Sequence, residues 1–199
     1  MSDEVAPHPD PLPAVAGRGS GWFLVLVILS ACGSGSPTPD AGVDAGVPDA
    51  GLTAFQQALL TAHDQVRTNA MPAPSPALPP MQWSSRAQAL AEEWAARCVF
   101  EHRDPNSLGE NIAAGTREYS AAGVVNDWAA EKTDYTYATN TCRLGASCGH
   151  YTQIVWRTSV GLGCAQQRCT TNSPFGSGDW FFVVCDYDPA GNFIGQRPY

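Results

Sequence analysis

The chain has 199 residues, a length that suits one domain with appendages. Its formal net charge of −8 is unevenly spread, because residues 52–199 hold 13 acidic and 10 basic side chains, a net charge of −3. No basic patch remains after this division, so we expect no nucleic-acid partner. We also expect the protein to be a monomer.

The first 31 residues have the pattern of an export signal. Trp22–Ser30 is an apolar run of nine residues, whereas a helix that spans a bilayer needs about 20. Leu29–Cys32 resembles the lipobox of bacterial lipoproteins, in which the cysteine is acylated and becomes the mature N-terminus. We therefore expect a signal peptide over residues 1–31 and an acyl anchor on Cys32. An ordinary secretory signal cut near Ala31 is the alternative.

Residues 32–51 are predicted to be a disordered linker. They are rich in glycine, proline and aspartate and contain no aromatic side chain, so they have too little apolar surface to order themselves. Such a segment can hold a domain away from a lipid surface. Gly33 stands where an acidic residue commonly retains lipoproteins at an inner membrane. We expect the outer membrane surface of the cell envelope, or the extracellular space, as the location.

Cysteine usage also indicates export. If Cys32 carries lipid, six cysteines remain, an even number suited to three disulfides in an oxidising compartment. Zinc bound by cysteines is the rival interpretation, but no Cys-x-x-Cys pair occurs. Six cysteines allow 15 pairings, and the count selects none of them. The six are Cys98, Cys142, Cys148, Cys164, Cys169 and Cys185.

The first half of residues 52–199 has helical periodicity. Thr53–Asn69 repeats apolar residues at three- and four-residue steps, with Thr53 as the N-cap, and the proline-rich stretch Met71–Pro80 must be an extended loop. A second helix begins at Ser84 or Ser85, where Ser85 and Gln88 fit a capping box. Its expected apolar stripe is Ala87, Leu90, Ala91, Trp94 and Cys98. A third helix is predicted over Ser120–Lys132, burying Ala121, Val124 or Val125, and Trp128.

The second half is predicted to be mainly strand. Gly149–Trp156 forms a short helix that places His150 and Ile154 on one face. Gly161–Gln167 alternates weakly, and Trp180–Tyr187 is a nearly continuous apolar run, as expected of a central strand covered on both faces. Turn residues between them predict an antiparallel hairpin. Helices followed by a small antiparallel sheet indicate an α+β domain.

Several stretches resemble the CAP superfamily of cysteine-rich secretory proteins, insect venom allergens and plant pathogenesis-related class-one proteins, and its SCP domain. The chain ending is most similar to the plant branch, and together the stretches cover about residues 53–199. They are Gly149–Trp156 (GHYTQIVW), Val184–Asn192 (VCDYDPAGN), Gly109–Ile112 (GENI), His63–Arg67 (HDQVR) and Asn192–Tyr199 (NFIGQRPY).

This resemblance implies a three-layer α-β-α sandwich stabilised by disulfides. It also implies the pairing Cys98–Cys169, Cys142–Cys148 and Cys164–Cys185. Each bridge would contribute typically 2–4 kcal/mol, with the shortest loop at the lower end.

The resemblance further implies a cleft that carries two histidines and two glutamates, at His102, Glu110, Glu131 and His150. Two imidazoles and two carboxylates could hold zinc or another divalent cation, the carboxylates acting as groups that orient the rings or a water. The alternative interpretation is that these are structural histidines and solvated glutamates.

Three features depart from the family pattern. Asp64 and Asp186 stand where asparagine is usual, so a charged acceptor replaces an amide donor at both positions. In addition, the spacing from His102 to Glu110 is longer than in the plant proteins. The hydrogen bonds beside the cleft are therefore expected to differ from the plant pattern.

Three functions are open on this evidence. The first is a binding module at the cell surface for a small apolar ligand, such as a sterol or fatty acid, or for a protein. The second is a passive envelope or adhesion component. The third is a hydrolase that uses His102 or His150 as base with a cation or a serine as partner. It is less favoured because neither a Gly-x-Ser-x-Gly nor a His-Glu-x-x-His motif occurs.

Overall fold

The computed structural model describes residues 51–199. The expected signal peptide, the linker up to residue 50 and Cys32 lie outside the described residues. The helices are α1 (Ala54–Thr68), α2 (Ser85–Ala95), α3 (Ala121–Ala130), the 3-10 turn η1 (Glu131–Thr133) and α4 (Gly149–Ile154). The strands are β1 (Gln82–Trp83), β2 (Gly109–Gly115), β3 (Tyr135–Thr136), β4 (Thr141–Cys142), β5 (Gly161–Cys169) and β6 (Trp180–Asp188).

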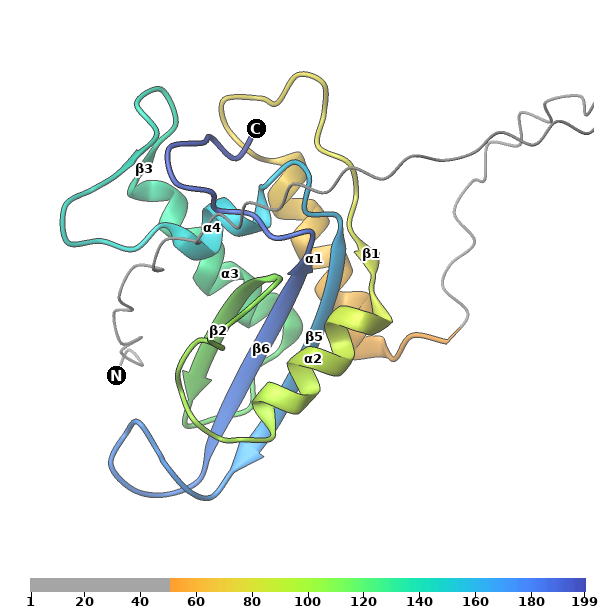
Figure 1. The fold of residues 1–199 in the computed structure, drawn as a ribbon, viewed down its shortest axis with the longest axis vertical. Coiled ribbons are helices and arrows are strands. Elements are labelled where there is room, and N and C mark those ends of the chain that lie inside the picture. Colours follow the sequence, from red (N-terminus) through yellow and green to blue (C-terminus); the bar gives the residue numbers. More distant parts are fainter. Residues whose placement is uncertain (1–50) are drawn as a thin grey trace, which may run out of the picture. The chain divides into compact units, whose positions relative to one another are not determined.

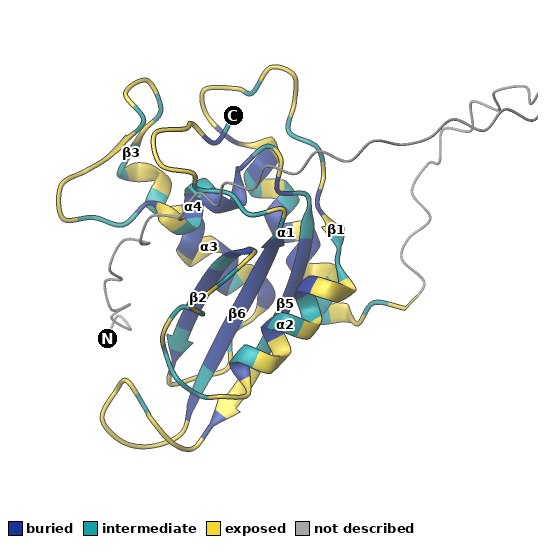
Figure 2. Ribbon diagram, in the orientation of Figure 1, coloured by how far each residue is buried: buried dark blue, intermediate teal, exposed yellow. Residues whose placement is uncertain are grey.

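The main sheet has the strand order β1-β5-β6-β2, and β3 and β4 form a separate small ribbon. Strand β6 pairs antiparallel with both β5 and β2, while the two-residue β1 runs parallel to β5. Figure 2 shows β6 buried along almost its whole length, as the apolar run predicts for a central strand. The predicted hairpin is also present, since β5 and β6 are joined by the turn residues 170–179.

Helices cover both faces of this sheet, so the three-layer α-β-α sandwich is confirmed. Successive side chains of a strand point to opposite faces. On β6, Phe182 and Val184 pack with Ala91 and Ala95 of α2. The residues between and after them pack with α1, α3 and α4: Val183, Cys185 and Tyr187 share a core with Leu59, Val124, Trp128 and Ile154. Figure 1 shows α2 on one side of the sheet and α1 and α3 on the other.

Helix α1 begins as its sequence predicts. The Thr53 hydroxyl accepts from the backbone N–H of Gln56, and the Gln56 side chain accepts from the backbone N–H of Thr53. This reciprocal capping box satisfies two of the N–H groups that a helix start leaves without partners. The helix ends at Thr68, and Asn69 is its C-cap.

The second helix begins at Ser85, as predicted, but the predicted capping box of Ser85 and Gln88 is wrong. Ser84 is the N-cap of α2 and accepts from the backbone N–H of Ala87, whereas the Gln88 side chain accepts from the indole N–H of Trp83. The predicted stripe was also too wide, because only the alanines Ala87, Ala91 and Ala95 are buried, while Leu90, Trp94 and Cys98 are half-buried.

The alanine face lets α2 lie directly on the sheet. A Cβ added to Gly163 of β5 would lie 1.9 Å from the backbone nitrogen of Gln88. Glycine is therefore required at this position, since any side chain would push α2 off β5.

Strand β2 was not predicted. Its sequence, Gly-Glu-Asn-Ile-Ala-Ala-Gly, has little β propensity and no clean alternation. Its extended state comes from the partner strand, because all seven residues are in register with β6, from Gly109 opposite Tyr187 to Gly115 opposite Phe181.

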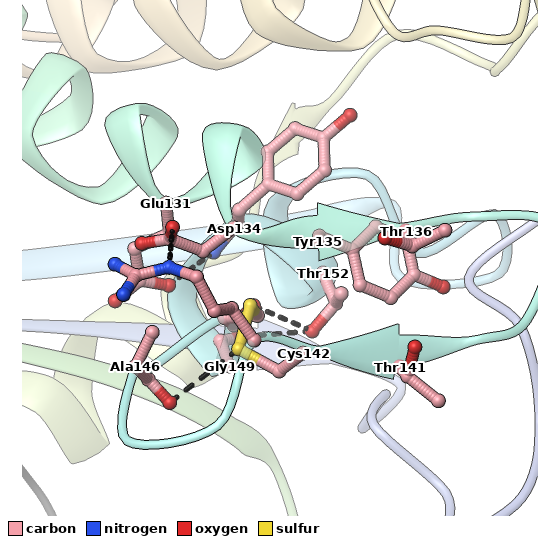
Figure 3. Close-up of a disulfide and its surroundings, with 12 residues drawn as sticks. Glu131, Asp134, Tyr135, Thr136, Thr141, Cys142, Ala146, Gly149 and Thr152 are labelled. Atoms are coloured by element: carbon pink, nitrogen blue, oxygen red, sulfur yellow. Dashed lines mark hydrogen bonds and ion pairs between the residues drawn. A yellow bond between two sulfur atoms is a disulfide. The ribbon is translucent and has the colours of Figure 1, made fainter.

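Three disulfides join the parts of the domain in the pairing that the family resemblance implies. Cys98–Cys169 ties the segment after α2 to the end of β5, and Cys164–Cys185 crosses directly between β5 and β6. Cys142–Cys148 closes the short loop before α4 (Figure 3). No helix within residues 51–199 has the length and apolar character that a membrane crossing requires.

Candidate functional site

Glu131 and His150 form the first of two histidine–glutamate pairs. Glu131 Oε1 lies 2.6 Å from His150 Nδ1, and Glu131 Oε2 accepts from the backbone N–H groups of His150 and Tyr151 at 2.9 and 3.1 Å. The carboxylate therefore caps the start of α4 and fixes the imidazole with the same group. The His150 ring also stacks on Trp128, with centroids 5.8 Å apart. Glu131 lies beside the Cys142 disulfide (Figure 3).

His102 and Glu110 form the second pair. Glu110, at the start of β2, is only 3% exposed, and its Oε1 lies 2.7 Å from His102 Nδ1. The same oxygen accepts from the backbone N–H of Arg103 at 3.0 Å. The longer spacing between the two residues thus does not prevent their contact, because the loop folds back onto the carboxylate.

The two pairs have the same chemical arrangement. A carboxylate only accepts hydrogen bonds, so Nδ1 carries the proton in the neutral ring and Nε2 keeps its lone pair. Histidine ligands of metals are commonly oriented by a carboxylate on the other ring nitrogen. Both glutamates contact Nδ1 of their histidine in this way.

The structure places the four predicted residues in two separate pairs, His102 with Glu110 and His150 with Glu131. Glu110 and Asn111 are neighbours on β2 and so point to opposite faces of the sheet. Glu110 contacts His102 on the face that α2 covers, whereas the Asn111 amide donates to the backbone carbonyl of His150 at 3.1 Å. Within residues 51–199, no three of the histidine, cysteine, aspartate and glutamate side chains are grouped closely enough to hold a metal ion.

Asn111 belongs to a buried network that sequence analysis missed. Its amide also donates to the Tyr187 hydroxyl at 3.0 Å, and that hydroxyl lies 2.9 Å from Nε2 of His63. His63 Nδ1 lies 2.8 Å from the carbonyl of Leu59. Burial lowers the pKa of His63 to about 4, so the ring is neutral at pH 7. It donates through Nδ1 to Leu59 and accepts through Nε2 from Tyr187.

The network connects α1, β6, β2 and the backbone of α4. Burial raises the pKa of Tyr187, which keeps its hydroxyl protonated as the network requires. A signal for Asn111 was present in the sequence: a polar residue between Glu110 and Ile112 must be satisfied if the segment is buried.

Arg103 is the second residue that sequence analysis missed. Its guanidinium donates to Asp186 Oδ2 at 2.6 Å and lies 3.5 Å from Glu110 Oε2. Asp186 is fully buried, and burial raises its pKa to about 6 despite the arginine. Glu110 and Asp186 are cross-strand partners, so Arg103 lies between two carboxylates. Asp186, which stands where the family usually has asparagine, is therefore paired with the guanidinium of Arg103 in the longer loop between His102 and Glu110.

Asp64, the other departure, contacts neither histidine–glutamate pair. Its Oδ1 accepts from the backbone N–H of Met81 at 2.8 Å, and burial raises its pKa. Nearby, Arg67 is buried and donates to the carbonyls of Ile154 and Trp156 at 2.7 and 2.9 Å. Arg67 thus binds the carbonyl end of α4, opposite the end that Glu131 caps.

Comparison with known proteins agrees with this fold. Residues 60–187 match the family model described as "Cysteine-rich secretory protein family" (CAP). Pathogenesis-related leaf protein 4 of Solanum lycopersicum is 44% identical over 124 residues, which are 60% of this chain and 72% of that protein.

Two solved structures have the same fold. Venom allergen-like protein 4 of Schistosoma mansoni is 26% identical, with a TM-score of 0.58 over 74% of this chain and 95% of that one. NaASP2, crystallised with Zn²⁺, is 25% identical, with a TM-score of 0.57 over 77% and 90%. The family is one of secreted proteins, and three disulfides within residues 51–199 agree with export. The match of the family model and the shared fold show that the chain belongs to the cysteine-rich secretory protein (CAP) family.

Proposed function

We propose that this domain is an exported binding module whose two histidines hold a divalent cation. One observation carries the proposal: each imidazole has Nδ1 held by a glutamate, at 2.6 Å for His150 and 2.7 Å for His102. Because β2 is an edge strand, the two pairs lie on either side of one sheet edge, where His102 and His150 would hold the ion through Nε2 with Glu110 and Glu131 as orienting groups. Zinc suits imidazole ligands and accepts further ligands at open positions. A related protein with the same fold was crystallised with Zn²⁺, which supports this choice.

The module would act outside the cell or at the outer surface of the envelope, held by an acyl chain on Cys32 and the linker that follows it. Its ligand would be a small apolar molecule, such as a sterol or fatty acid, or a protein partner. A passive envelope or adhesion component would use the same scaffold without any ligand.

A hydrolase is the weaker candidate. All six cysteines of the described residues are paired in disulfides, so none of them is a free thiol nucleophile. The two imidazoles are chemically able to act as bases, but the arrangement of each pair is equally that of a metal ligand with its orienting carboxylate.

The test is thermal unfolding of the protein with added zinc. A ligand that binds only the folded state stabilises it by mass action, by about 2.7 kcal/mol at a concentration one hundred times Kd. We expect zinc to raise Tm by several degrees and the rise to be lost in His102→Ala and in His150→Ala. Glu93→Gln, at an exposed position of α2, is the control. An equal rise in all four proteins would show that zinc binds elsewhere.

A further inference from the structure

The Cys142–Cys148 disulfide lies at the surface of the domain. Cys142 is an exposed residue of β4, whereas Cys148, which directly precedes α4, is 7% exposed. The segment that the bridge closes is mostly exposed, with Leu144 at 98%. Figure 3 shows the bridge joining β4 to the chain at the start of α4. One of its sulfur atoms therefore belongs to a residue that solutes can reach, and the other belongs to a buried residue.

The other two disulfides of the described residues are shielded by the core. Cys164 and Cys185 lie opposite each other on β5 and β6 and are 5% and 0% exposed. Cys169 is 1% exposed and packs in one cluster with Trp180, and its partner Cys98 is half-buried against that cluster. Thiol–disulfide exchange begins with direct attack on a sulfur atom, so its rate depends on access. The packed core hinders attack on both of these bridges.

Both ends of the Cys142–Cys148 bridge are also held by other contacts. Arg143 donates from its backbone N–H to the carbonyl of Asp134 at 2.8 Å and from Nε to the Asp134 carboxylate at 2.6 Å. These bonds keep β4 beside β3 without the bridge. On the other side, Glu131 accepts from the first N–H groups of α4. Opening the bridge therefore frees the short segment between β4 and α4 and leaves the main sheet in place.

We infer that Cys142 is a thiol–disulfide exchange site that takes up a small-molecule thiol. The incoming thiolate attacks Sγ of Cys142 and forms a new S–S bond with it, while the bond between Cys142 and Cys148 breaks. Cys148 leaves as a thiolate and takes a proton from water. Attack by the Cys148 thiolate on the mixed disulfide reverses the step and releases the thiol. The thiol is the only co-reactant, because one disulfide is exchanged for another.

The exchange acts on the chain just before the helix that carries His150. Cys148 lies two residues before His150, so the state of the bridge sets how freely the preceding segment moves. Exposed disulfides are typically the labile or regulatory ones, whereas shielded ones are structural. This site involves none of the four residues of the histidine–glutamate pairs and does not depend on the proposed function.

The test is incubation of the full exported protein in glutathione buffers of increasing reducing strength. Acid quenching, alkylation with iodoacetamide under denaturing conditions and peptide mass mapping then assign the state of each cysteine. We expect the Cys142–Cys148 bridge to open first, with glutathione attached to Cys142 and alkylation of Cys148, while the other two bridges stay closed. Hydrogen exchange should become faster in residues 143–147 and stay slow in β6.

Two serine variants test which sulfur atom is accessible. Cys148→Ser leaves Cys142 as a free thiol, and Cys142→Ser leaves Cys148 as a free thiol in the same loop. Each is treated with dithiobis(nitrobenzoate), and the release of the coloured thiolate is followed. We expect the Cys142 thiol to react about tenfold faster or more, because buried cysteines are inert.

Several outcomes would overturn the inference. These are the opening of a shielded bridge at the same or a weaker reducing strength, glutathione attached to Cys148, and equal reaction rates of the two folded serine variants. Loss of the near-ultraviolet circular dichroism on the first reduction would show that the bridge opens only with the whole fold. Opening by reduced thioredoxin but not by glutathione would replace the small thiol by a protein dithiol. If a serine variant is unfolded, the mapping of the parent protein decides the matter.

Discussion

At the scale of single residues, the most consequential contact is that of Arg103 with two buried carboxylates. Asp186 and Glu110 have side chains that are 0% and 3% exposed, and Arg103 itself is 15% exposed. Charges removed from water to this extent require partners, because the loss of their hydration is not otherwise offset. Arg103 therefore stabilises the very glutamate that orients His102.

Replacing Arg103 by glutamine should destabilise the domain strongly. Removing one member of a buried ion pair typically costs about 3–5 kcal/mol, because the remaining charge is left uncompensated. Urea unfolding should show this loss for Arg103→Gln. The double variant with Asp186→Asn, which restores the residue usual in the family, should recover most of it.

The matched control for this experiment is Arg97→Gln. Arg97 is 57% exposed and pairs with Glu93 at 3.7 Å on the surface of α2, where an ion pair contributes about 1 kcal/mol or less. A loss in Arg103→Gln no larger than that in Arg97→Gln would contradict the role assigned to the buried cluster.

The two histidine–glutamate pairs illustrate how far a sequence motif can predict a site. His102, Glu110, Glu131 and His150 came from family motifs, and no local pattern could show that each histidine would meet a glutamate. Asn111 and Arg103 were missed because their roles depend on partners distant in the chain, 39 residues away for Asn111 and 83 for Arg103. Local periodicity carries no information about such partners.

At the scale of elements, α4 depends wholly on its surroundings. It has six residues, and isolated helices shorter than about 12–15 residues are marginal in water. Glu131 binds its first N–H groups, Arg67 binds carbonyls at its end, and Asn111 binds the carbonyl of His150. Three elements thus hold the helix that carries His150.

Glu131→Gln should therefore loosen α4. The amide can supply only one acceptor oxygen for the three donors that the carboxylate now satisfies, so buried donors lose partners at about 1–3 kcal/mol each. We expect faster hydrogen exchange at the backbone amides of His150 and Tyr151, with slow exchange kept in β6. Glu101→Gln, at an exposed position, is the control. Unchanged exchange at both amides would show that Glu131 does not hold the helix.

Elements with strong periodicity were predictable, and those that depend on neighbours were not. The structure confirms the helices α1, α2 and α3 and the strands β5 and β6, with boundaries shifted by a few residues. Strand β2 was missed because its small residues become a strand only through pairing with β6.

At the scale of the whole molecule, the three disulfides close loops of very different length. Cys98 and Cys169 are 71 residues apart, Cys164 and Cys185 are 21 apart, and Cys142 and Cys148 are 6 apart. A bridge restricts the unfolded chain more strongly when its loop is longer. The largest restriction therefore joins the segment after α2 to the distant end of β5.

Paired serine substitutions should follow this order. The loop-length relation gives about 4 kcal/mol for Cys98–Cys169, about 3 for Cys164–Cys185 and about 2 for Cys142–Cys148. Urea unfolding of the three double-serine variants measures each loss. The loss of Cys142–Cys148 should be the smallest, although this bridge is nearest to His150. A larger loss there than for Cys98–Cys169 would mean that native-state contacts of the short loop, and not chain restriction, set its effect.

The anchoring of the β5–β6 hairpin has a practical consequence. Cys169, the last residue of β5, is bound to Cys98, and the indole of Trp180, the first residue of β6, donates to the carbonyl of Thr171. Both ends of the connecting segment are therefore held. Residues 170–179 are mostly exposed and contribute little to either core. Exposed loop tips of this kind tolerate insertions. A foreign peptide grafted between Ser173 and Ser177 would be displayed on this disulfide-bonded scaffold without disturbing the domain beneath it.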